Sequence, residues 1–244
     1  MKKIFALLFI TTVLISIPLV AAANSKPAVT KIVFIHRVQD FAKPEGVGKP
    51  AKDVADYEFL PKNVKWTSLD LEFVINPTND DGLSADSVAT AIIDATNEWD
   101  LWSSANLFYD YDIASIVFDS SAVLDTDVRD GKNEIVFGTI DEPNAIAMCV
   151  VWGVFVGPPS ARQIVEFDII FNDEYYEWGN ADDDSTVMDL QNIVTHELGH
   201  ALGLADLYDS TMYQQTMYGY ATYGETIKRD LYDGDKAGIV ALYG

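Results

Sequence analysis

A short stretch toward the C-terminal end of the chain, residues 195–206, reads THELGHALGLAD. Its two histidines, His196 and His200, are four positions apart, and on an α-helix such positions lie on the same face. Two imidazoles on one face can bind a single metal ion, and zinc accepts two histidines together with a third protein ligand. Glu197 follows the first histidine, close enough to take a proton from a water on that metal. The stretch therefore predicts a metal-bearing helix with a catalytic carboxylate.

The helix around these residues is predicted from apolar spacing. Apolar side chains recur at or near one helical face after a start at residue 185 or 186, at positions Val187, Leu190, Val194, Leu198 and Ala201. Gly203 is a favourable left-handed stop residue. Because the chain can turn back there, Asp206 can approach the same metal, whereas a continuing helix would carry it away.

The third metal ligand has few candidates, because the chain contains only three histidines. Asp206 is the nearest acidic residue after the predicted turn, and carboxylates are accepted zinc ligands. Asp209 and Glu225 are fallback ligands. His36 is a remote alternative, and we interpret it first as an ordinary strand histidine.

The composition narrows the possible partners. The formal net charge is −22, with 38 acidic against 16 basic residues, which argues against a nucleic-acid partner and against docking on an anionic membrane. The chain is 49% apolar, which is enough for a substantial core. The single cysteine, Cys149, excludes an internal disulfide and is interpreted as a free, buried thiol.

The N-terminal part is predicted to be processed. Residues 1–23 combine a basic start, an apolar run and three alanines, which is typical of a signal peptide. We therefore expect a secreted protein with no membrane anchor after cleavage. Residues 24–50 form an N-terminal segment and linker, in which residues 31–38 alternate like a strand and 43–50 read KPEGVGKP. Whether this segment is a removable prosegment or an extra strand stays open.

The remaining residues, 51–244, are predicted to form one α+β domain. Strands are expected at residues 69–75, 113–118, 134–137, 145–156 and 164–171. Helices are expected from 84 to about 102, from 185 or 186 to Gly203, and over 233–242. The fold class is thus a twisted mixed sheet, mostly parallel with an antiparallel edge strand, two main helices and a short helical C-terminal part.

The metal-binding stretch resembles the extended zinc motif of the metzincins, and residues 55–244 are similar to the matrixin catalytic domain. Supporting segments are WTSL at 66–69, NEIVFG at 133–138, MYG at 217–219 and the C-terminal GDKAGIVALYG. The resemblance implies a secreted zinc endopeptidase with a metzincin-like fold, with Met217 beneath the zinc and a substrate strand antiparallel to residues 144–151.

Several features depart from that family. A histidine is usual where this chain has Asp206, and the second, structural zinc of vertebrate matrixins has no histidines here between 37 and 195. Cys149 does not match the inhibitory cysteine of latent matrixins. The resemblance also implies structural calcium, for which we assign no ligands although oxygen-rich residues cluster in the relevant region, namely Asp168, Asn172, Asp173, Glu174 and Asp182 to Asp184.

The predicted function is hydrolysis of protein or peptide substrates by a zinc-activated water, with zinc on His196, His200 and Asp206 and with Glu197 as base. We expect a monomer. One alternative is a secreted binding protein that has lost activity on the same fold. The other is a metal-dependent amidase that acts on cell-wall peptides.

Overall fold

The computed structural model describes residues 27–39, 56–123 and 126–244. The predicted signal peptide and the linker at 43–50 lie outside the described residues. Within the described ranges, each helix is too short or too polar for a membrane span. The strands and helices are β1 Thr30–Val38, β2 Glu58–Phe59, η1 Pro61–Asn63, β3 Val74–Asn76, α1 Ala85–Leu101, β4 Val117–Phe118, β5 Glu134–Gly138, β6 Ala145–Val154, η2 Pro159–Ala161, β7 Gln163–Asn172, β8 Trp178–Gly179, β9 Met188–Asp189, α2 Leu190–Leu202, β10 Leu204–Ala205, η3 Ser210–Met212, β11 Tyr220–Ala221, η4 Ile227–Arg229 and α3 Asp233–Tyr243.

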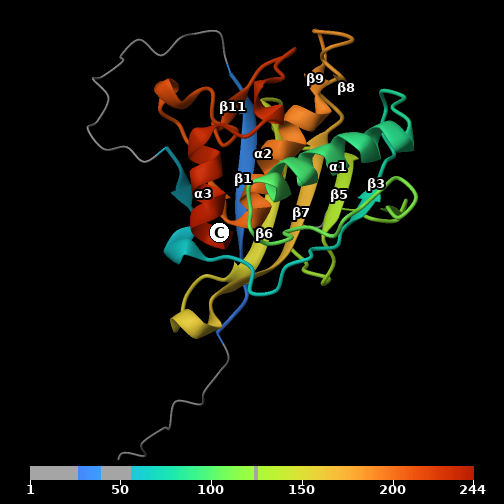
Figure 1. Ribbon diagram of the computed structural model, residues 1–244. Helices are drawn as coiled ribbons and strands as arrows, with labels where there is room; N and C mark the ends of the chain where they lie inside the picture. The colour runs from blue at the N-terminus through green and yellow to red at the C-terminus, as the bar shows by residue number, and fades with distance from the viewer. Residues whose placement is uncertain (1–26, 40–55, 124–125) are drawn as a thin grey trace, which may run out of the picture.

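The main sheet has seven strands in the order β11-β1-β6-β7-β5-β3-β4 (Figure 1). β6 is antiparallel to both of its neighbours, β1 and β7. From β7 onward the pairs with β5, β3 and β4 are parallel, and β1 is also parallel to β11. The predicted mixed sheet is confirmed. However, β6 is not an edge strand, because β1 and β11 continue the sheet beyond it.

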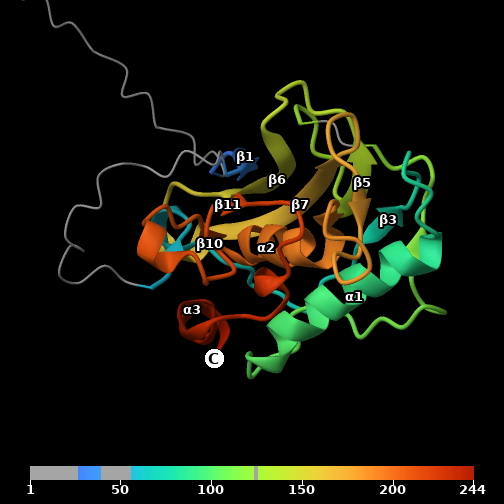
Figure 2. The same ribbon diagram turned by 90° about the horizontal axis from the view of Figure 1, so that it is seen from above.

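Two helices, α1 and α2, cover one face of this sheet (Figure 2). Ser84 caps α1 by accepting a hydrogen bond from the Ser87 backbone N–H. Val88, Ile92 and Ala95 of α1 are buried, and Trp99 on the same face donates a hydrogen bond from Nε1 to the Thr195 carbonyl at 2.8 Å. This bond ties α1 to the helix that carries the predicted metal ligands.

The start of α2 differs from the prediction at residue 185 or 186. The helix begins at Leu190, because the two preceding residues form β9 and pair with β8. Asp189 caps the helix by accepting from the Asn192 N–H at 2.8 Å, and Arg229 Nε donates to the same carboxylate oxygen at 2.8 Å. The predicted end is confirmed, since Gly203 follows the last helical residue with φ of 110°.

The predicted strand at residues 69–75 is largely wrong. Asp70 has a φ of 67°, which interrupts an extended strand, and Leu71 makes only an isolated bridge to Phe108. The continuous strand is β3, Val74–Asn76. The strand predicted at 113–118 likewise shrinks to β4, whereas β5, β6, β7 and α3 agree with their predictions within a few residues.

The close packing of the turn at Gly203 can be tested by substitution. Gly203→Ala would place a Cβ 2.8 Å from the Val64 carbonyl oxygen, in addition to forcing alanine into the left-handed region. Gly82→Ala is the matched control, since Gly82 has a φ of +76° but open space around the added Cβ. We expect about 1 kcal/mol of destabilisation for Gly82→Ala and a larger loss for Gly203→Ala, measured by urea unfolding. Equal losses would show that the close approach to Val64 is unimportant.

Candidate metal centre

Three side-chain donors from α2 and the following turn converge on one point. His196 Nε2 lies 3.1 Å from His200 Nε2, and Asp206 Oδ1 lies 3.3 Å from the first nitrogen and 3.4 Å from the second. Ligands of a tetrahedral zinc at about 2.0–2.1 Å are separated from one another by about 3.3 Å. Asp206 Oδ1 is also buried without a hydrogen bond in the described part of the chain. The donor triangle therefore fits zinc.

The outer atoms of these ligands are held by hydrogen bonds. His196 Nδ1 lies 2.7 Å from the Thr216 carbonyl, and His200 Nδ1 lies 3.0 Å from the Leu204 carbonyl. A carbonyl can only accept a hydrogen bond, so Nδ1 carries the proton and each Nε2 lone pair is free for a metal. Tyr208 donates from its hydroxyl to Asp206 Oδ2 at 2.9 Å, which leaves Oδ1 directed toward the histidines.

Met217 packs against α2 at Gly199, the residue that precedes His200. A Cβ added at Gly199 would overlap the Met217 sulfur and would lie 2.9 Å from the Trp99 ring, so the helix can approach this turn only with glycine there. Asp235 of α3 accepts hydrogen bonds from the Thr216 N–H at 2.6 Å and the Met217 N–H at 3.1 Å. This buried carboxylate fixes the turn whose carbonyl orients His196.

Glu197 is completely buried beside the donor triangle. Within the described residues, neither of its carboxylate oxygens forms a hydrogen bond. Burial raises the pKa of Glu197 to about 8, and a metal dication bound nearby would lower it again. Burying an unpaired carboxylate destabilises the folded state. The position of Glu197 next to the proposed metal ligands suits a proton acceptor.

The charges of the three metal ligands are complementary. Burial alone would raise the pKa of Asp206, but the neighbouring His200 and His196 hold it well below its usual range. Burial lowers the pKa of His196, whereas the Asp206 carboxylate outweighs burial at His200 and raises its pKa. Zinc requires an anionic carboxylate and neutral imidazoles, so its binding would release any proton that His200 holds.

β1 covers this centre, a contact that the sequence did not predict. His36 is fully buried, and its ring centroid lies 3.8 Å from that of His196. Phe34, two residues earlier, stacks on His200 with ring centroids 3.9 Å apart and an interplanar angle of 11°. His36 Nδ1 also lies 3.4 Å from Glu197 Oε1. The alternation of residues 31–38 predicts the strand itself, but its partner is far away in sequence.

The other predicted ligand positions lie elsewhere. Asp209 accepts from the Thr211 N–H at 2.9 Å, and Glu225 accepts from the Lys228 ammonium. Among the described residues, only two groups of three possible ligands come together within 4.8 Å: His36 with His196 and Glu197, and His196 with His200 and Asp206. The acidic residues considered for calcium form no such group in this part of the chain.

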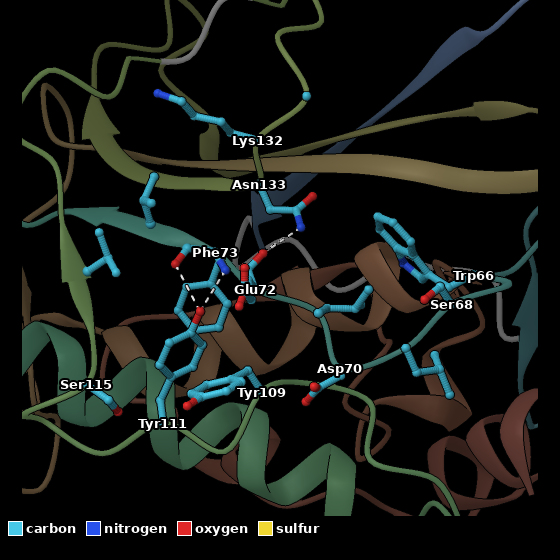
Figure 3. A pocket seen from close by; sticks show the side chains of 15 residues that line it. Trp66, Ser68, Asp70, Glu72, Phe73, Tyr109, Tyr111, Ser115, Lys132 and Asn133 are labelled. Carbon is cyan, nitrogen blue, oxygen red and sulfur yellow. Dashed lines mark hydrogen bonds between the residues drawn. The ribbon is translucent and has the colours of Figure 1, made fainter.

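A separate cavity of about 640 Å³ is lined by the segment that leads into β3, by part of β3 and by the residues just before β5 (Figure 3). Tyr111 and Tyr109 line it, and Asn133 donates to the Glu72 carbonyl at 2.7 Å across its wall. None of the predicted site residues lines this cavity, so it is not part of the metal centre.

Comparison with known proteins gives a family-level match for most of the chain. The family model described as Matrixin matches residues 65–244, which include α1, α2, the turn at Met217 and α3. No curated protein matches the chain. The matched region begins after β1, so the strand that covers the metal centre lies outside it.

The hydroxyl of Tyr208 provides a test of the metal centre. No sequence pattern identified this residue. Tyr208→Phe removes the hydrogen bond to Asp206 while keeping the ring, so we expect zinc affinity to fall by about tenfold or more. The control is Tyr213→Phe, since Tyr213 is 56% exposed. Competition with a chromophoric chelator measures both. Unchanged affinity for Tyr208→Phe would show that Asp206 needs no such support.

Proposed function

Since the chain belongs to the matrixin family of zinc-dependent endopeptidases, we propose that His196, His200 and Asp206 hold its catalytic zinc and that Glu197 is the catalytic base. The observation that carries this assignment is the donor triangle, with edges of 3.1, 3.3 and 3.4 Å. Its substrates are proteins or peptides, as the family implies.

In the proposed mechanism, a bound zinc, Glu197 and the two histidines have different roles. A bound zinc supplies Lewis acidity, which makes a water nucleophilic near neutral pH and polarises the scissile carbonyl. Glu197 accepts the proton of that water and passes it to the leaving amine. His196 and His200 keep their orientation through the carbonyls that accept from Nδ1.

Membership of the matrixin family also bears on the localisation of the protein and on the extent of its catalytic domain. Matrixins are typically secreted, and we propose that residues 1–23 act as the export signal. The catalytic domain is proposed to span residues 51–244 and to act as a monomer. Of the two alternatives, the inactive binding protein is disfavoured by the presence of Glu197, and the cell-wall amidase has no specific observation in its favour.

Glu197→Gln tests the catalytic assignment. The amide cannot accept a proton, so casein hydrolysis should fall by about 10²- to 10⁴-fold while the metal ligands stay in place. Glu58→Gln, on an exposed strand, is the matched control and should keep full activity. Casein zymography compares the variants with the unmodified protein. A band of normal strength for Glu197→Gln would contradict the role of base.

We also propose calcium binding, from the acidic residues around β7 and the loop before α2. Backbone carbonyls and waters can complete such sites, so a group of three carboxylates is not required. If calcium binds the folded state, CaCl₂ should raise the melting temperature of the zinc-loaded protein by about 2–4 °C for each kcal/mol of binding energy. Equal MgCl₂ is the control. Identical melting curves in the two salts would reject the proposal.

A further inference from the structure

The cavity beside β3, which the proposed mechanism does not use, has aromatic side chains on two sides (Figure 3). Trp66 lies on one side, and Tyr109 and Tyr111 lie on the other. The acidic residues Glu72 and Asp70 lie between them in the same view. The volume of about 640 Å³ falls within the range of about 300–1,000 Å³ that is usual for ligand pockets. The cavity therefore has room for a side chain and for part of the backbone that carries it.

The aromatic walls are held in place by hydrogen bonds and ring packing. Trp66 Nε1 donates to the Ala201 carbonyl at 2.7 Å. The Tyr111 hydroxyl accepts from the Phe73 N–H at 3.1 Å and donates to the Phe73 carbonyl at 3.3 Å. Tyr109 packs edge-on against Tyr111 with ring centroids 4.9 Å apart, yet it remains 40% exposed. Because these rings are fixed before a ligand binds, binding would cost little side-chain entropy.

A left-handed backbone turn places Asp70 at the cavity. Its φ is 67°, a region that residues other than glycine seldom adopt. Asn106 holds the turn, because its carbonyl accepts from the Asp70 N–H and its Nδ2 donates to the Asp70 carboxylate, each at 3.3 Å. Glycine or asparagine would adopt this conformation at no greater cost. Backbone geometry alone therefore does not explain a negative charge at this position.

The lining of the cavity carries an excess of negative charge. It includes two exposed carboxylates, on Asp70 and Glu72, and one ammonium, on Lys132. That ammonium also faces Asp119, whose Oδ2 lies 3.7 Å away. Burial raises the pKa of Tyr111, and the charges of Glu72 and Asp70 raise it further. Their field therefore reaches the aromatic wall, and a cation between the walls would be attracted by both carboxylates.

Aromatic faces and carboxylates in one cavity suit a guanidinium group. A guanidinium is planar and always charged, so it can stack on a ring while it forms paired hydrogen bonds with a carboxylate. An ammonium is more strongly hydrated and has no flat face, and an anion would be repelled. The net charge of −22 adds a long-range attraction for a basic partner. The chemistry of the cavity thus favours an arginine side chain.

We propose that this cavity binds an arginine side chain in an extended basic segment of a protein substrate, with the guanidinium against Tyr109 and paired with Glu72 and Asp70. The binding itself does not need the metal, because neither Glu197 nor a proposed metal ligand lines the cavity. The role in substrate binding rests on the proposed function. There the cavity holds the substrate at a second point, which raises its effective concentration at the metal centre.

The test measures how a short peptide binds to the full chain with Glu197→Gln, which prevents cleavage of the probe. The peptide is capped at both ends, carries a neutral fluorescent dye and has one arginine as its only charge. Its counterpart has citrulline, which keeps the shape without the charge. Fluorescence anisotropy at low salt should show at least about tenfold tighter binding of the arginine peptide. Equal binding, or no binding of the arginine peptide at about 1 mM protein, would overturn the proposal.

Substitution of the two carboxylates tests their part in the site. Asp70→Asn with Glu72→Gln keeps the shape of the cavity and should weaken the arginine peptide by about tenfold. The matched control, Asp86→Asn with Glu58→Gln, removes the same charge from exposed positions outside the cavity. It should change the affinity by less than about twofold. Equal weakening in both double variants would show only a general attraction to an acidic protein and would overturn the site.

Amide chemical shifts show where the arginine peptide binds. Saturation should shift the amide signals of Glu72 and Tyr109 and leave those of α2, which carries His196 and His200, unchanged. Shifts confined to α2 would place the peptide at the metal centre and overturn the cavity site. Casein hydrolysis by the chain with Glu197 intact tests the proposed function separately. Peptide binding in the cavity of a protein that hydrolyses no casein would overturn only the role in substrate binding.

Discussion

The left-handed turn at Gly203 is the constraint on which the metal centre depends. It stops α2 three residues after His200 and reverses the chain, so that Asp206 meets the two histidines instead of continuing along the helix axis. The close approach of Gly203 to the Val64 carbonyl shows that this reversal is packed against the rest of the domain. The position of the proposed third ligand is thus a consequence of where a helix ends.

Around this turn, buried polar groups form a connected support. Asp235 at the start of α3 holds the Thr216–Met217 backbone, the Thr216 carbonyl orients His196, and the Met217 sulfur packs under Gly199. Such groups are costly to bury unless each has a partner. In the described residues six buried side-chain atoms lack a hydrogen bond; one is Asp173 Oδ1, and the other five, on Glu197, His36 and Asp206, gather at the proposed metal centre, where a metal and its substrate would supply the missing partners.

Local patterns in the sequence predicted most of this centre. The i, i+4 spacing predicted that His196 and His200 share one face of a helix. The tendency of glycine to end a helix in the left-handed conformation predicted the turn at Gly203 and hence the approach of Asp206. Non-local pairing could not be predicted in the same way. The start of α2 shifted because β9 pairs with β8, and the position of His36 depends on pairing between β1 and β6, which are more than a hundred residues apart. An alternating pattern predicts a strand but not its partner.

Metal content by mass spectrometry tests the central claim most directly, on purified protein and on the variants Asp206→Ala and Asp209→Ala. The account predicts one zinc per chain in the unmodified protein, a marked loss with Asp206→Ala, and no change with Asp209→Ala, whose carboxylate caps a short turn instead. Zinc that stays bound at full occupancy without the Asp206 carboxylate, or no zinc in the unmodified protein under conditions that retain metal, would contradict it.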